Sequence, residues 1–110
     1  MKQHLLLSFL LSLSLLSLGQ NVPSYVPTNG LVGWWPFNGN ANDESGNGNN
    51  GVVNGAILSN DRNGNANKCY SFNGSGNYIG LSSNNLPTSS RTISVWFYAN
   101  SLDGGPAILG

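Results

Sequence analysis

Short apolar runs alternate with longer polar stretches along this chain. No window repeats apolar residues at helical spacing, whereas β-branched and aromatic residues fill the runs and Asn, Gly, Ser or Pro bound them. The pattern therefore predicts an all-β, antiparallel fold made of short strands. The expected strands are 31–37, 51–58, 68–73, 77–81, 91–99 and a last one that begins at 106 after a turn at 103–105.

The run Arg91–Ala99 (RTISVWFYA) has the clearest strand signal, because its side chains alternate over its full length. One face is wholly apolar and is expected to be core: Ile93, Val95, Phe97 and Ala99. The other face combines polar and aromatic side chains, among them Trp96 and Tyr98. These two rings are candidates for contact with a sugar, with cover by a neighbouring loop as the alternative.

Seven Asn-Gly dipeptides mark reversals of the backbone, since both residues tolerate positive φ. The clearest hairpin is expected between 68–73 and 77–81, joined by Asn73-Gly74-Ser75-Gly76. Asn73-Gly74-Ser75 is also a formal glycosylation acceptor, but a turn already explains these residues. Within 51–58, Asn54-Gly55 is interpreted as a bulge rather than a full turn.

The aromatic run Leu31–Phe37 leads into a long polar loop, 38–50, that is expected to be neither strand nor helix. Asp43 and Glu44 are the only adjacent carboxylates in the chain. Such a loop can offer one carboxylate, side-chain amides and carbonyl groups to a Ca²⁺ ion, so Asp43 is the candidate metal ligand. The alternative, which the residues favour slightly, is an Asx-turn in which Asp43 accepts the amides of Ser45 and Gly46.

The first nineteen residues are typical of a signal peptide: a basic Lys2, an apolar run from Leu5 to Leu16, and small residues before a cleavage point between Gly19 and Gln20. The run is short for a bilayer, so an uncleaved membrane anchor is the weaker alternative. We therefore expect a secreted or cell-surface protein without a transmembrane segment after cleavage. Residues 20–29, which include two prolines, are expected to form an extended leader.

Charge and composition exclude several classes of function. Removal of residues 1–19 leaves three basic and four acidic side chains and no histidine, so the chain has no basic surface for nucleic acid. The set of His and Cys ligands that a zinc site requires is also lacking, so zinc-dependent chemistry is not expected. The single cysteine, Cys69, has two interpretations: a disulfide to a cysteine outside this sequence, or a small buried side chain, which its apolar surroundings favour.

Five motifs in order resemble one known family. They are Gly30 to Gly51, Asp61 to Ala66, Tyr70 to Gly74, Asn77-Tyr78-Ile79 and Thr92 to Trp96. Together they resemble the laminin-G-like jelly roll of the concanavalin A-like lectin/glucanase superfamily, as found in secreted bacterial proteins. The resemblance implies an antiparallel β-sandwich over residues 30–110 that is incomplete at its C-terminal end. It also implies calcium at the sandwich rim, with Asp43 the residue to try first.

The expected function is a secreted, non-catalytic module for binding or cell adhesion. It would recognise a carbohydrate or an extracellular protein through rim loops and one sheet face, with Ca²⁺ as a candidate cofactor. No strand carries the alternating carboxylates that glucanases of this superfamily use, so no catalytic residue is assigned within the chain. The alternatives are the N-terminal part of a secreted glycoside hydrolase or lyase, with catalytic residues beyond Gly110, and a structural spacer.

Overall fold

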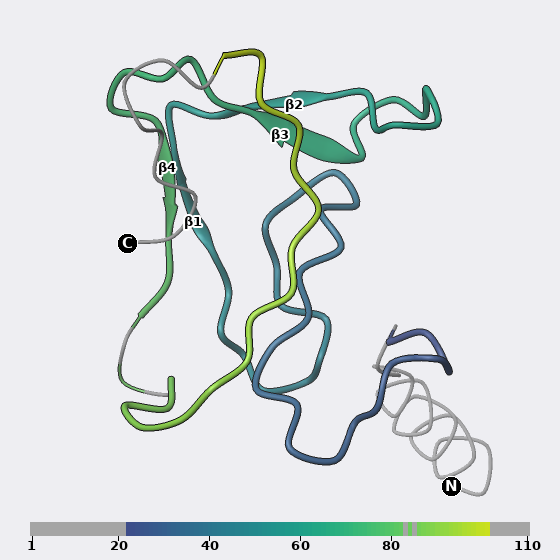
Figure 1. The fold of residues 1–110 in the computed structure, drawn as a ribbon, viewed down its shortest axis with the longest axis vertical. Helices are drawn as coiled ribbons and strands as arrows, with labels where there is room; N and C mark the ends of the chain where they lie inside the picture. Colours follow the sequence, from purple (N-terminus) through teal and green to yellow (C-terminus); the bar gives the residue numbers. More distant parts are fainter. Residues whose placement is uncertain (1–21, 83, 85, 102–110) are drawn as a thin grey trace, which may run out of the picture.

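The computed structural model describes residues 22–82, 84 and 86–101. These residues form no helix and four strands of three residues each: β1 (Val52–Asn54), β2 (Ile57–Ser59), β3 (Cys69–Ser71) and β4 (Tyr78–Gly80). Two antiparallel sheets of two strands result, β1 with β4 and β2 with β3 (Figure 1). Antiparallel β-structure is thus confirmed, whereas the described residues are mostly coil and show no sandwich or jelly roll. The signal peptide and the strand expected at 106 lie outside them.

The run 51–58 contains both β1 and β2, which pair with different partners. Val53 lies opposite Ile79 in one sheet, and Leu58 lies opposite Tyr70 in the other. Between them the backbone turns at Gly55, whose φ of 72° suits glycine, and β1 and β2 leave this point in different directions (Figure 1). The single strand predicted over 51–58 is therefore wrong, because Asn54-Gly55 forms a corner between two sheets; Tyr78 lies opposite both residues there, as at a bulge.

The expected hairpin is also wrong in its pairing, although both of its strands are present. β3 and β4 follow each other along the chain, yet each pairs with a strand from the run 51–58. The connection is a tight polar loop in which Asn73 Oδ1 accepts the Ser75 N–H at 2.8 Å, and Asn77 Oδ1 accepts the Asn73 N–H at 2.9 Å. This loop closes on its own side chains, so β3 and β4 need not pair with each other. The predicted turn at Asn73-Gly74-Ser75 is confirmed.

Leu31–Phe37 is not a strand, contrary to prediction, although its residues are half-buried. The polar loop 38–50 folds back on it and supplies hydrogen bonds that a neighbouring strand would otherwise make. The segment ends at Phe37, where φ is 55°, and the Phe37 ring meets Tyr70 edge to face at 5.2 Å between centroids. That contact joins the first segment to β3.

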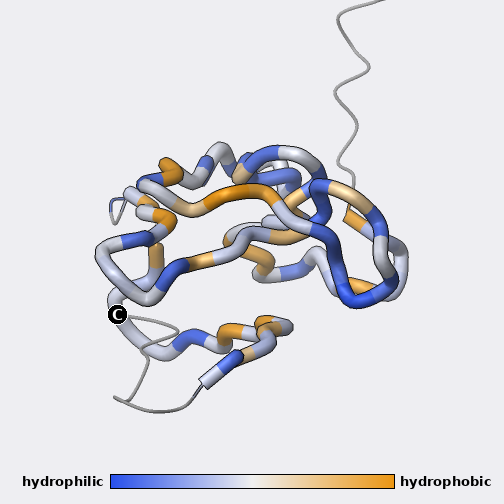
Figure 2. The backbone as a smooth tube through the Cα atoms, turned by 90° about the horizontal axis from the view of Figure 1, so that it is seen from above, coloured by the Kyte–Doolittle hydropathy of each residue, from blue (hydrophilic) through white to orange (hydrophobic). Residues whose placement is uncertain are grey.

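Burial in the described residues is concentrated on small and polar side chains. The buried ones are Ala41, Ser45, Asn49 and Ala56, three of them from the polar loop. Hydrophobic positions are spread along the backbone in short runs and do not gather at one centre (Figure 2). Three loop residues are therefore buried against the rest of the structure, while most of the loop stays exposed.

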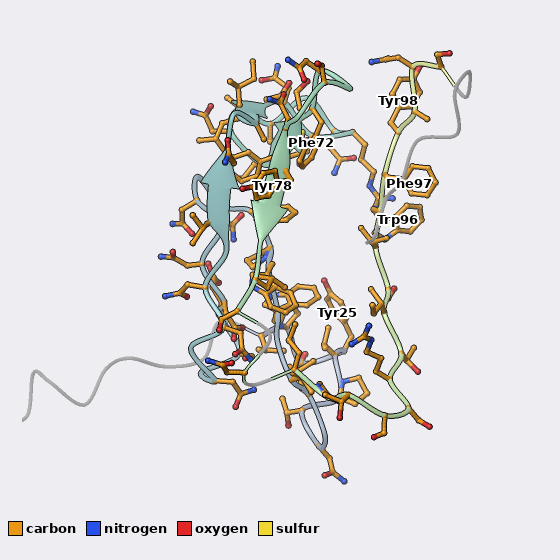
Figure 3. The ribbon with its side chains drawn as sticks, turned by 90° about the vertical axis from the view of Figure 1, so that its left-hand side faces the viewer. Tyr25, Phe72, Tyr78, Trp96, Phe97 and Tyr98 are labelled. Atoms are coloured by element: carbon orange, nitrogen blue, oxygen red, sulfur yellow. The ribbon has the colours of Figure 1, made fainter. Side chains whose placement is uncertain are left out.

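The segment 91–99 differs most from expectation. It contains no strand, and residues 92–99 make no backbone hydrogen bond to another described residue. The expected core side chains Ile93, Val95 and Phe97 are 54%, 48% and 60% exposed. Figure 3 shows this segment standing apart from the strands. A ladder needs a second chain segment beside the first, so a strong strand pattern alone does not form one.

Two matched substitutions distinguish a core segment from an exposed one. We expect Phe97→Ala to lower the free energy of unfolding by less than about 1 kcal/mol, whereas a phenylalanine in a packed core costs about 3–5 kcal/mol. Phe37→Ala should cost more, about 2 kcal/mol, because Phe37 is half-buried and loses its contact with Tyr70. Urea unfolding followed by tryptophan fluorescence measures both values. A larger loss for Phe97→Ala than for Phe37→Ala would contradict the described packing.

Candidate functional site

Side chains of the polar loop hold the backbone of the aromatic segment. The Asn47 Nδ2 group donates to the carbonyls of Leu31 at 2.8 Å and Val32 at 3.1 Å, and Asn49 Nδ2 donates to the same Val32 carbonyl at 2.8 Å. In return, the indole of Trp35 donates to the Asn49 carbonyl at 2.8 Å. Asparagine amides thus replace the ladder of a partner strand, and the loop is fixed against the segment.

Asp43 lies at the centre of this arrangement. Its Oδ1 accepts the backbone N–H groups of Trp34 and Ser45, both at 2.9 Å, and its Oδ2 accepts that of Asn49 at 3.0 Å. The Ser45 hydroxyl also bonds the carboxylate. The bond to Ser45 confirms the predicted Asx-turn; the other partners are Trp34 and Asn49 in place of Gly46. Asp43 therefore joins the middle of the loop and its C-terminal end to the aromatic segment.

The pKa of Asp43 follows from these contacts. Partial burial raises the pKa of its carboxyl, but the hydrogen bonds from Trp34, Ser45 and Asn49 together outweigh this effect. The pKa therefore lies below the ordinary value of 3.8, because each bond stabilises the charged form. Asp43 is an anion throughout the neutral range.

The arrangement around Asp43 does not suit a bound cation. A carboxylate offers about four acceptor positions, and four donors already reach this one. Among the described residues no group of three or more His, Cys, Asp or Glu side chains could hold a metal ion. Among the side-chain oxygens of the loop, Oδ1 of Asn49 is buried without a hydrogen-bond partner. Calcium at Asp43 stays a prediction, and it would require backbone donors to leave the carboxylate.

Trp96 and Tyr98 form the second candidate site. Their side chains are 85% and 88% exposed, more than any other large hydrophobic residue in the described part of the chain. Both belong to the segment that stands apart in Figure 3. The guanidinium of Arg62 lies 4.6 Å from the centroid of the Trp96 ring, within the range of a cation–π contact. One ring face is thereby held while most of the side chain stays open to solvent.

The loop that carries Arg62 is shaped by Asp61. Asp61 Oδ1 accepts the N–H groups of Asn63 at 2.8 Å and Asn65 at 2.9 Å, and its Oδ2 accepts the Asn65 side-chain amide at 3.1 Å. The Asn65 bonds and the one from Asn63 hold the pKa of Asp61 below its ordinary value. An ordered turn therefore presents Arg62 to Trp96 from a part of the chain more than thirty residues away.

The thiol of Cys69 lies apart from these two sites. Cys69 is a free, half-buried thiol whose Sγ donates to the Asn60 carbonyl at 3.1 Å, so it is less buried than predicted.

No helix in the described residues is long and apolar enough to cross a membrane.

Sequence reasoning did not find Asn47, Asn49 or Arg62. The sequence pattern Asp61-x-Asn-Gly-Asn does indicate a turn closed by its first carboxylate, so the loop beside Arg62 could have been found. The two asparagines could not, because their partners lie 15 to 17 residues earlier in the chain.

Comparison with known proteins gives no match: no family model, no curated protein and no solved structure is significantly similar to this chain. The resemblance to the laminin-G-like jelly roll therefore stays a prediction.

Replacement of Asp43 should loosen the polar loop. In Asp43→Asn, an amide group would have to replace one carboxylate oxygen and face a backbone N–H. We expect the free energy of unfolding to fall by about 1–2 kcal/mol, the lower part of the range for a charged hydrogen bond because the site is only partly buried. Urea unfolding gives the value. Glu44→Gln is the matched control, since the Glu44 carboxylate makes no hydrogen bond to a described residue, and it should change little.

The same carboxylate predicts a dependence on pH. The pKa of Asp43 is lower in the folded state, so its contribution to stability is present above pH 3.8 and is lost as the pH falls through the folded pKa. The stability difference between the original chain and Asp43→Asn should therefore shrink below about pH 4. Urea midpoints measured from pH 7 to pH 2.5 test this. A difference that stays constant over the whole range would contradict the assigned hydrogen bonds.

Proposed function

We propose that this chain is a secreted, non-catalytic module that binds carbohydrate, with an extracellular protein as the alternative partner. Its exposed aromatic side chains would make the contact, and the neighbouring polar loops would supply hydrogen bonds. The observation that carries the proposal is the exposure of Trp96 and Tyr98 on one segment. Exposed aromatic rings are unfavourable in water and typical of surfaces that bind a ligand.

The spacing of the two rings supports contact with an extended ligand. Trp96 and Tyr98 are two positions apart, so in an extended backbone they lie on the same side, roughly 6–7 Å from each other. Arg62 on one face of Trp96 restricts the orientation of the ring before a ligand arrives. Such preorganisation lowers the entropic cost of binding.

The Arg62 loop adds groups that suit a sugar. Asn63 and Asn65 follow Arg62 closely in the chain, and all three side chains are exposed. Amide and guanidinium groups donate hydrogen bonds to hydroxyl oxygens, and rings contact the apolar faces of a sugar. A carbohydrate therefore fits this combination better than a nucleic acid, which would require more positive charge.

The finer architecture belongs to the same proposal. A β-sandwich of the laminin-G-like type over residues 30–110 would place the segment 91–99 in a sheet. Secretion rests on the signal-like segment 1–19. The rival, the N-terminal part of a glycoside hydrolase or lyase, needs two carboxylates facing a glycosidic bond. Asp43 is a poor candidate for either role, because its oxygens are bound to the backbone.

A binding experiment tests the proposal directly. A glycan array identifies a ligand, and titration of the chain with that soluble oligosaccharide gives its affinity. We expect Trp96→Ala and Tyr98→Ala each to weaken binding by about tenfold, the effect of losing a central aromatic contact. Tyr25→Ala is the matched control, because Tyr25 is 80% exposed but belongs to the N-terminal segment, and it should leave affinity unchanged (Figure 3).

Two further outcomes decide between the alternatives. Absence of any glycan on the array would contradict the carbohydrate proposal and leave the extracellular protein. Equal losses for Tyr25→Ala and Trp96→Ala would show that the segment 91–99 has no special role. Repeating the titration with a chelator tests the calcium prediction: unchanged affinity and unchanged melting temperature would remove it.

A further inference from the structure

The chain contains seven Asn-Gly pairs, and each is a potential site of spontaneous deamidation of the asparagine. In such a pair the backbone nitrogen of Gly can attack the side-chain carbonyl carbon of Asn. A new C–N bond forms and the bond from this carbon to Asn Nδ2 breaks; the proton lost by the Gly nitrogen is balanced, through solvent, by the one the departing Nδ2 gains as it leaves as ammonia. Water then opens the five-membered succinimide at either carbonyl, giving aspartate or isoaspartate without any change in oxidation state. All seven asparagines are exposed, so access to water does not separate them.

The seven pairs differ in whether the attacking nitrogen, the backbone N–H of the glycine, is hydrogen-bonded. Gly39 N–H donates to the carbonyls of Phe37 and Asn67, both at 2.9 Å. Gly51 N–H donates to a carbonyl at 2.8 Å, and Gly64 N–H to another at 3.0 Å. An N–H group engaged in this way must first break its bond before it can be deprotonated and attack. The pairs at 38, 50 and 63 are therefore protected.

At three other pairs the asparagine side chain is held instead. Asn47 Nδ2 has three acceptors within 3.1 Å. Asn54 Nδ2 donates to the Tyr78 hydroxyl at 2.9 Å, and Asn73 Oδ1 accepts the Ser75 N–H at 2.8 Å. Each of these side chains would have to release a partner and rotate before its carbonyl carbon could meet the next nitrogen.

Asn29-Gly30 is the exception. Neither the Asn29 side chain nor the Gly30 N–H makes a hydrogen bond to a described residue. The pair occupies the centre of a turn closed by one bond, from Leu31 N–H to the Thr28 carbonyl at 3.1 Å. A Cβ built on Gly30 would meet nothing within 4 Å, so space for ring closure is available.

We propose that Asn29 is the primary site of spontaneous deamidation in the folded chain. The product matters because of its position, between the N-terminal leader and the aromatic segment that begins at Leu31. Isoaspartate adds a methylene group to the main chain at this turn, and either product adds a negative charge. Modification would change how the leader enters the domain while leaving the Asp43 network in place.

Peptide mapping by mass spectrometry tests the proposal. The chain is incubated at pH 8 and 37 °C, folded and in concentrated urea, and conversion is followed at all seven sites. Breaking one hydrogen bond slows a reaction roughly fivefold, so the folded-to-unfolded rate ratio should be near one at Asn29 and about 0.2 or lower elsewhere. Normalising each site to its own unfolded rate removes the influence of neighbouring residues.

Asn29→Gln is the control variant, because the longer side chain disfavours the five-membered ring. It should abolish conversion at position 29 and leave the ratios at the other six sites unchanged. A folded-state ratio at Asn29 as low as those of the other sites would overturn the proposal. Ratios near one at every site would overturn it as well, since the hydrogen bonds assigned to the other pairs would then give no protection.

Discussion

Backbone N–H and C=O groups that leave water must find partners, and the N-terminal half of this structure depends on how that requirement is met. In the segment 31–37 the partners are side chains. Asp43 accepts the Trp34 N–H, and the side-chain amides of Asn47 and Asn49 donate to the carbonyls of Leu31 and Val32. One carboxylate and two amides therefore replace a neighbouring strand, and they fix the polar loop against the aromatic segment.

The segment 91–99 shows the opposite outcome. Its β-branched and aromatic residues favour an extended backbone as strongly as those of 31–37, but among the described residues no Asp or Asn side chain bonds to the backbone of 92–99. Its large apolar side chains stay about half exposed or more. An extended backbone alone therefore does not form a strand here, because a strand also needs a neighbouring segment that accepts and donates its hydrogen bonds.

Hydrogen bonds within loops also affect the proposed binding surface and the proposed deamidation of Asn-Gly pairs. Asp61 orders the turn that carries Arg62 to Trp96, and so restricts the ring proposed to contact a ligand. Bonds of the same kind hold the glycine nitrogens and asparagine amides of most Asn-Gly pairs. In a chain so rich in Asn and Gly, loop bonds therefore influence both the binding surface and the rate of covalent damage.

Local chemistry by itself determined the extended segments of β1 to β4, the irregular loop 38–50 and the turn at Asn73, because propensity and Asx-turns act over a few residues. The Asx-turn at Asp43 is of the same kind. Only the tertiary structure decided that β4 pairs with β1 and β3 with β2, that Asn47 and Asn49 hold the aromatic segment, and that Arg62 lies over Trp96. Every strand edge presents the same donors and acceptors, so the choice of partner depends on which distant segments the folded chain brings together.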